Sequence, residues 1–176
     1  ERLGIPHLLS HPDPIYSLRE VESLVQKGGT RMPFVLKSSR TVSGSDHFVA
    51  YDPEQIQSKL PLWLEQLRRN TGEVIVFAER YLEGGRKLEV PFARLHDGRT
   101  VVFPRVDTSL QSRNRRLVEF CPPVSIDPAA EVKVVEWTRQ FAASMGYVGV
   151  GSLEFLVDGA NAYLIGGSAR LTSSFH

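Results

Sequence analysis

Cysteine is nearly absent from this chain of 176 residues: Cys121 is the only one, so an internal disulfide is excluded. Long apolar runs are also missing, because no segment reaches the roughly 18 apolar residues that a membrane span requires. The five histidines and the cysteine lack the spacing of metal ligands, which argues against a zinc site. A net charge of +1 provides no general attraction for nucleic acid or anionic membranes. We therefore expect a globular cytoplasmic protein with neither nucleic-acid nor membrane partners.

Both ends of the sequence look interrupted. Residues 1–6 read as the end of a helix that enters a loop, and residues 173–176 follow a strand signal with no closing element. With 41% hydrophobic and 23% charged residues, the chain can still bury one substantial core. We expect a compact piece of a longer protein.

Three helices are predicted from capping residues and apolar spacing. Ser17 and Glu20 form a capping box before the first helix. Asp52 caps the second, which Pro61 is expected to kink or split. The third begins after Asp127. Its predicted apolar side is formed by Val132, Val135, Phe141 and Met145.

Strand signals lie between and after these helices. They cover residues 33–37, 47–51, 74–78, 88–92 and 101–103, with a final hairpin over residues 147–165. If the turn of that hairpin is symmetric about Ala160, Glu154 stands opposite Gly166. No internal repeat is present, and the order of elements indicates mixed α+β layers rather than a doubly wound sheet.

Two charged residues lie at the ends of predicted strands. Lys37 directly precedes a loop of small polar residues, where an ammonium group and backbone amides can hold phosphates. Glu79 follows the strand over residues 74–78, where a carboxylate and exposed amides can bind an adenine or a ribose. A lysine at the end of a strand is more often a solvated edge charge, and for Glu79 a charged strand terminus is an equal alternative.

Arginines concentrate in one segment, and a glutamate stands alone in another. The segment contains Arg105, Arg113, Arg115 and Arg116, together with Gln111 and Asn114. Guanidinium forks bind phosphate, bicarbonate or carboxylates. Stacking aromatics, which single-strand nucleic-acid binders use, do not interleave with these arginines. Glu119 is a further carboxylate of interest, and alternation places Glu154 on the sheet face opposite Leu153 and Phe155, open to a cation or to solvent.

The order of these segments resembles the ATP-grasp domain of biotin carboxylases and, more distantly, that of carbamoyl-phosphate synthetase large subunits. Residues 79–82 are similar to the family's E-K-Y-L, and residues 109–119 to S-x-Q-R-R-N-Q-K-V-V-E. Residues 146–156 resemble G-Y-x-G-A-G-T-V-E-F-L. Further similar segments are residues 2–6, 32–39, 86–90 and 170–171.

The resemblance implies an α+β ATP-grasp fold, two lobes gripping a nucleotide, incomplete at both ends. The implied regions are an N-terminal segment and helix (1–27), a small lobe (28–83) and part of a large lobe (84–176). The implied activity is that of an ATP-dependent ligase, which binds MgATP, activates bicarbonate as carboxyphosphate and carboxylates biotin. Its implied partners are a biotin carrier domain and the carboxyltransferase of a carboxylase.

The resemblance also implies roles for individual residues. Nucleotide contacts fall to Lys37, Glu79, Leu82, Lys87 and Gln111. Arg113 and Arg170 face bicarbonate or carboxyphosphate, and Glu154 is the remaining metal ligand.

Several positions depart from the family pattern. The glycine-rich phosphate lid is replaced by residues 40–46, which keep one glycine. The second metal-binding glutamate falls at Gly166 and an asparagine at Ser168, which removes oxygens that magnesium uses. Two other hypotheses therefore stand beside the carboxylase: a non-catalytic ATP-grasp relative with a structural or regulatory role, and an ATP-grasp ligase of other specificity.

Overall fold

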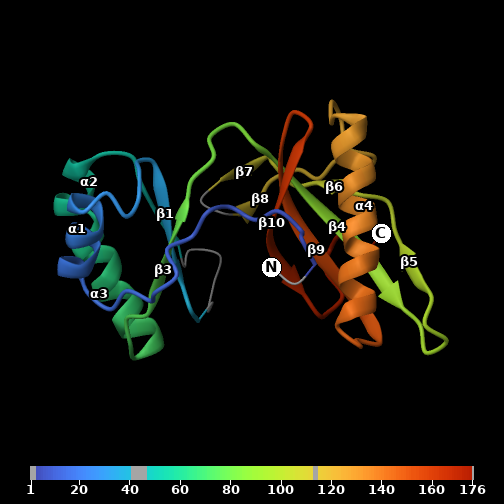
Figure 1. Cartoon of the computed structure of the whole chain (residues 1–176), viewed down its shortest axis with the longest axis horizontal. Coiled ribbons are helices and arrows are strands. Elements are labelled where there is room, and N and C mark those ends of the chain that lie inside the picture. The colour runs from blue at the N-terminus through green and yellow to red at the C-terminus, as the bar shows by residue number, and fades with distance from the viewer. Residues whose placement is uncertain (1–2, 41–46, 113–114, 176) are drawn as a thin grey trace. The chain divides into compact units, whose positions relative to one another are not determined.

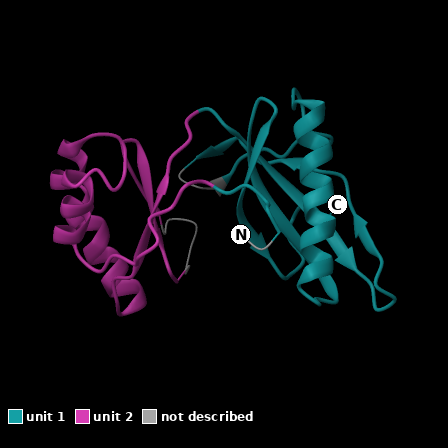
Figure 2. Ribbon diagram, viewed as in Figure 1, with its two compact units in different colours: residues 1–7, 84–176 teal, residues 8–83 magenta. Residues whose placement is uncertain are grey.

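The computed structural model describes residues 3–40, 47–112 and 115–175, and it divides into two compact units (Figure 2). Unit 1 consists of residues 1–7 and 84–176, and unit 2 of residues 8–83. Most of the predicted N-terminal segment, from residue 8 onward, thus groups with unit 2. No helix among the described residues is both long and apolar enough to cross a bilayer.

Unit 2 is a three-stranded antiparallel sheet with helices on one side (Figure 1). The strand order is β2 (His47–Ala50), β1 (Phe34–Ser38), β3 (Val76–Arg80). The helices are α1 (Leu18–Gln26), α2 (Pro53–Ser58) and α3 (Leu60–Thr71). Apolar side chains from the helices and from the central strand form one core, which includes Val21, Phe34 and Leu60.

The helix ends of unit 2 confirm the predicted signals. The Ser17 hydroxyl accepts a hydrogen bond from the Glu20 N–H, and the Glu20 carboxylate accepts one from the Tyr16 N–H. Helix α2 ends and α3 begins at Lys59, whose backbone stays in the right-handed region with a φ of −110°, so Pro61 falls in the first turn of α3.

The strand predicted over residues 74–78 is shifted by two residues in the structure. Glu79 and Arg80 belong to β3, because they pair with Val35 and Phe34 of β1. Glu79 is therefore part of the sheet, and the prediction that it follows the strand was wrong.

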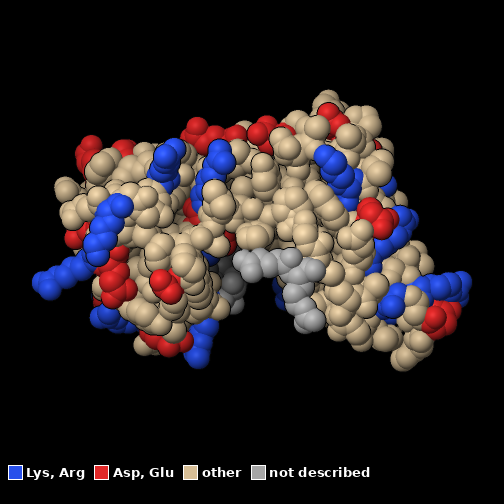
Figure 3. Space-filling model, in the orientation of Figure 1, with Lys and Arg blue, Asp and Glu red and all other residues tan. Residues whose placement is uncertain are grey.

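Unit 1 is built on an antiparallel sheet in the order β10-β9-β4-β5, with β6 also beside β4. Its strands are β4 (Arg86–Arg94), β5 (Thr100–Val102), β6 (Val106–Asp107), β9 (Gly149–Asp158) and β10 (Asn161–Ser168). The short strands β7 (Gln111–Ser112) and β8 (Arg115–Arg116) pair antiparallel, and α4 (Pro128–Ser144) lies along the larger sheet (Figure 1). Basic and acidic side chains are interspersed on the visible face (Figure 3).

The predicted apolar side of α4 was wrong for Val132 and Met145, whereas Phe141 packs against the core of unit 1. Val132 is 71% exposed and Met145 is 62% exposed. The buried residues are Ala130, Val134, Thr138 and Ala142, a row with a spacing of four. Small side chains in that row let the helix backbone approach the sheet closely, and the Thr138 hydroxyl is satisfied by donating to the Val134 carbonyl at 2.7 Å.

The final hairpin places Glu154 opposite Gly166, as predicted, but by a different route. Asp158 pairs with Asn161, so the turn is centred between residues 159 and 160. A register shift between Leu164 and Gly166 then leaves Ile165 unpaired and moves the partner of Glu154 by one residue. The bulge, rather than a symmetric turn, produces the Glu154–Gly166 pairing.

Candidate functional site

In unit 2 the structure brings together two of the predicted nucleotide-binding residues. Lys37 and Glu79 lie on neighbouring strands, and the Lys37 Nζ is 2.6 Å from the Glu79 Oε2. Their side chains are 34% and 23% exposed, so both remain accessible to a ligand. The altered lid falls largely on residues 41–46, which lie outside the described residues.

The chain beyond β3 is held by an aromatic pair. The Tyr81 ring packs edge-on against Tyr51 with centroids 5.7 Å apart, and the Tyr81 N–H donates to the Pro33 carbonyl. A hydrogen bond with the Tyr51 hydroxyl, together with burial, raises the pKa of Tyr81 to about 12. Leu82, the next predicted nucleotide contact, is half-buried directly after this anchored residue.

In unit 1 the structure brings together the other two predicted nucleotide contacts. The Lys87 Nζ donates to the Gln111 Oε1 at 3.2 Å, and the Gln111 amide nitrogen donates to the Thr108 carbonyl at 2.8 Å. The Lys87 backbone N–H donates to the Ser109 hydroxyl. Hydrogen bonds thus connect Lys87 of β4 to residues 109 and 111.

Asp107 fixes that segment. It is fully buried, accepts hydrogen bonds from the hydroxyl and the backbone N–H of Ser109, and forms an ion pair with Arg86. Burial would raise the pKa of the Asp107 carboxyl, but the bonds from Ser109 and the pairing with Arg86 hold it below its ordinary value of 3.8. The sequence reasoning missed this residue.

Arg116 lies among three carboxylates in unit 1. Its Nη1 is 2.5 Å from the Glu89 Oε2 and 3.2 Å from the Glu119 Oε1, and its Nη2 is 3.3 Å from the Glu154 Oε1. Glu89 and Glu154 are neighbours on β4 and β9, which explains why one guanidinium reaches both. We call these four residues the Arg116 cluster.

Glu89 is the buried member of the Arg116 cluster. Thr172 and Ser174 donate hydrogen bonds to its two carboxylate oxygens at 2.5 and 2.7 Å. Burial would raise the pKa of this carboxyl, but the hydrogen bonds from Thr172, Ser174 and Ser152 and the charge of Arg116 lower it below the ordinary 4.5. Glu89 therefore stays ionised inside the protein.

Arg116 is held in its charged form by the same contacts. Burial would lower the pKa of its guanidinium, but Glu89, followed by Glu119 and Glu154, raises it above its ordinary value. The sequence reasoning placed Arg116 among anion-binding arginines and did not single out Glu89. A charged residue between Leu88 and Val90 in an apolar strand was the available signal, because a buried carboxylate needs a cation or several donors.

The described residues do not fit a resident magnesium site. They contain no group of three or more histidine, cysteine, aspartate or glutamate residues able to hold a metal ion. Glu154 has Gly166 opposite it on one side and Glu89 on the other, and one of its oxygens already accepts from Arg116. Its predicted role as a metal ligand stays a prediction.

The remaining arginines are dispersed. Arg170 is exposed beyond the end of β10, and Arg113 lies outside the described residues. Arg105 forms an ion pair with Glu131 of α4, which is not a member of the Arg116 cluster. Of the predicted anion-binding arginines, Arg116 is engaged by three carboxylates and Arg170 is exposed, and the role of Arg170 stays a prediction.

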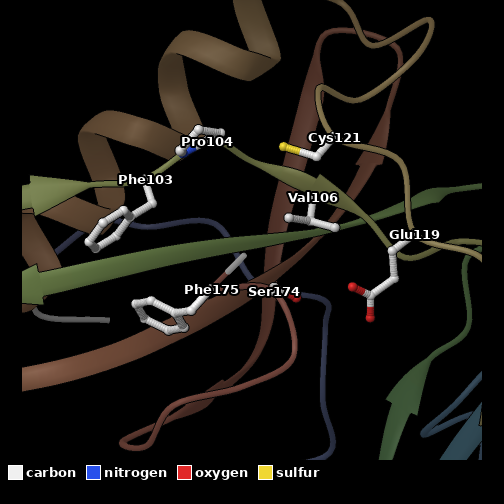
Figure 4. Close-up of a pocket in the computed structure, with 7 residues that line it drawn as sticks. All are labelled: Phe103, Pro104, Val106, Glu119, Cys121, Ser174 and Phe175. Atoms are coloured by element: carbon white, nitrogen blue, oxygen red, sulfur yellow. The ribbon is translucent and has the colours of Figure 1, made fainter.

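A pocket of about 300 Å³ lies beside the Arg116 cluster, with which it shares Glu119 (Figure 4). The rings of Phe103 and Phe175 form its apolar end, with centroids 5.3 Å apart. Ser174, which donates to Glu89, also lines the pocket, as does the Cys121 thiol. The pocket thus has an aromatic end and a hydrogen-bonding end.

Comparison with known proteins gives a family match over residues 1–175: the carbamoyl-phosphate synthase L chain, ATP binding domain. The chain is similar to the pyruvate carboxylase of Bacillus subtilis, at 25% identity over 94% of the chain and 14% of that protein. It is also similar to the chloroplastic biotin carboxylase 1 of Populus trichocarpa, at 27% identity over 90% of the chain and 30% of that protein. The chain thus spans less than a third of these relatives.

Solved structures share the fold. The biotin carboxylase of Campylobacter jejuni superposes with a TM-score of 0.85 at 23% identity, covering 98% of this chain and 38% of that one. The N5-carboxyaminoimidazole ribonucleotide synthetase of Thermus thermophilus superposes with a TM-score of 0.75 at 20% identity, covering 98% and 43%. The predicted ATP-grasp fold is confirmed.

Proposed function

This chain belongs to the family of the carbamoyl-phosphate synthase L chain ATP-binding domain, and on that premise we propose that it binds ATP in an ATP-grasp site of the biotin carboxylase type. The predicted nucleotide contacts are Lys37, Glu79, Leu82, Lys87 and Gln111. A lysine that pairs with a protein carboxylate when no ligand is bound can turn to a phosphate when ATP binds. Its positive charge is then balanced in both states.

The Lys37–Glu79 pair is the observation that carries the proposal. The two groups are 2.6 Å apart and incompletely buried, so Lys37 can exchange its carboxylate partner for phosphate oxygens while Glu79 turns to a ribose or adenine donor. In unit 1, the Lys87 Nζ donates to the side-chain amide oxygen of Gln111.

The reaction we propose for the parent protein has two steps. Transfer of the γ-phosphoryl group of ATP to a bicarbonate oxygen gives ADP and carboxyphosphate. The carboxyl group then passes to biotin on a carrier domain, and phosphate leaves, before a carboxyltransferase uses the carboxylated biotin. Arg170 and Arg113 are the proposed bicarbonate-side cations, since guanidinium forks match planar oxyanions.

Magnesium enters this proposal with ATP, and no step is assigned to a metal held by the chain alone. In the Arg116 cluster, Glu154 and Glu89 both contact the Arg116 guanidinium, so Glu89 does not serve as a second metal ligand beside Glu154. Binding of the ATP phosphates therefore relies on the lysines named above.

Calorimetric titration of ATP, with magnesium present, tests the proposal. We expect the wild-type chain to bind ATP and Lys37→Ala to bind it at least tenfold more weakly, because loss of a charge-assisted hydrogen bond removes roughly 1.5–3 kcal/mol. Lys59→Ala is the matched control, because Lys59 is an exposed lysine of the same unit, and it should bind like the wild type.

Two results would count against ATP binding at this site. One is the absence of any ATP binding by the folded chain, which would favour the non-catalytic relative. The other is equal affinity of Lys37→Ala and Lys59→Ala, which would remove Lys37 from the site.

A further inference from the structure

The Arg116 guanidinium fills the space between carboxylates that a metal ion would otherwise need. It contacts Glu89, Glu119 and Glu154, which come from three different parts of the chain. Two of its nitrogens make these contacts, so the planar fork acts as a multivalent donor. The side chain is 27% exposed, against none for Glu89, and is therefore largely enclosed by its partners.

The carboxylate oxygens nearest to Arg116 are already committed. Glu89 accepts from Thr172 on one oxygen and from Ser174 on the other, in addition to its contact with Arg116. One oxygen of Glu119 accepts from both Arg116 and Ser173. A divalent cation would have to displace these donors as well as shed its own water, which magnesium does reluctantly.

Gly166 removes a possible further ligand at the same place. It faces Glu154 across the β9–β10 hairpin, and a methyl group built on it would lie 3.4 Å from the Glu154 Oε2. A longer acidic side chain there would reach the cluster, but glycine offers no oxygen beyond its backbone.

We infer that Arg116 is the fixed cation of this site, and that the nucleotide-free chain takes up no divalent cation between Glu89, Glu119 and Glu154. Magnesium then reaches the protein only as its complex with ATP. This inference rests on the Arg116 cluster and does not depend on ATP binding, so either proposal can fail without the other.

Manganese titration followed by electron paramagnetic resonance tests the inference, because bound Mn²⁺ loses the signal of the free ion. The wild-type chain without nucleotide should give the same uptake as Glu154→Gln. If the wild type bound one Mn²⁺ per chain and Glu154→Gln lost it, the inference would be overturned.

Removal of the guanidinium supplies the converse test. Arg116→Met leaves three carboxylates close together without a cation, so we expect its Mn²⁺ affinity to rise at least tenfold over the wild type. Arg99→Met is the matched control, because exposed Arg99 pairs only with Asp97 among the ion pairs of the described residues, and it should show no gain.

Circular dichroism decides whether Arg116→Met is folded. A folded Arg116→Met with wild-type Mn²⁺ uptake would contradict the inference. If this variant does not fold, Arg116→Lys replaces it. A single ammonium group cannot bridge all three carboxylates, so we expect Arg116→Lys to take up more Mn²⁺ than the wild type. Unchanged Mn²⁺ uptake would contradict the inference.

Discussion

Glu89 shows how a single buried charge organises unit 1. Its side chain is fully buried in β4, and hydroxyls from Thr172 and Ser174, far along the chain, converge on it together with Arg116. These hydroxyls are donors that keep Glu89 ionised.

The lowered pKa of Glu89 predicts acid sensitivity of unit 1. Its folded-state pKa lies below the ordinary 4.5, so the unfolded chain takes up the proton first as the pH falls. The stabilisation from ionised Glu89 is thus complete above that value and is lost as the pH falls through the folded-state pKa. Asp107 contributes in the same direction.

Urea denaturation between about pH 6 and about pH 3 measures this effect. A Trp63→Phe background leaves Trp137, which stacks on Phe155 in unit 1, as the only tryptophan. We expect Glu89→Gln to reduce the pH dependence of the unfolding free energy, and exposed Glu136→Gln to leave it unchanged. A wild-type slope in Glu89→Gln would show that Glu89 is not the titrating group.

The ion-pair partners of charged residues could not be predicted from the sequence. The sequence predicted Lys37 and Glu79 separately, and the structure pairs them. It grouped Arg105 and Arg116 because they are close in sequence, yet they contact Glu131 and Glu89, respectively. Salt-bridge partners depend on which strands become neighbours, and local spacing does not determine that.

At the scale of elements, capping signals were reliable and apolar faces less so. Ser17 and Asp52 accept hydrogen bonds as caps because that interaction is local. The buried row of α4 was mispredicted because three of its four residues are alanine or threonine, while Val132 is exposed. The hydrophobicity of a helix does not by itself show which of its faces must carry small residues so that the helix can pack closely on a sheet.

Gly151 and Gly166 of the β9–β10 hairpin have different roles. A methyl group at Gly151 would lie 2.7 Å from the Ser168 carbonyl oxygen and 3.0 Å from the Phe92 ring, whereas at Gly166 its nearest neighbour is the end of the Glu154 side chain at 3.4 Å. Gly151 is therefore required by packing, and Gly166 is not.

Alanine at each position tests this difference in stability. Gly151→Ala should lower the free energy of unfolding by about 1–3 kcal/mol through overpacking. Gly166→Ala should leave it unchanged or raise it by up to about 1 kcal/mol, because alanine loses less backbone entropy than glycine in a strand. Chemical denaturation of both variants measures it, and equal destabilisation would contradict the assigned roles.

At the scale of the whole molecule, the resemblance in ordered segments predicted the family and the fold. The family match over residues 1–175 and the fold shared with biotin carboxylase confirm both. The bulge at Ile165 could not be predicted, because it is a local irregularity within the β9–β10 hairpin that no turn residue marks. The Arg116 cluster could not be predicted, because it depends on the register between β4 and β9, which are distant in sequence.

Photolabelling with 8-azido-ATP tests the central claim, ATP binding at the predicted site, most directly. The azide sits on the adenine ring, so the label should attach within residues 79–82, located by mass spectrometry, and excess ATP should abolish it. Labelling of that segment should also fall in Lys37→Ala but not in Lys59→Ala. Label found only elsewhere, or label in residues 79–82 that ATP does not displace, would contradict the account.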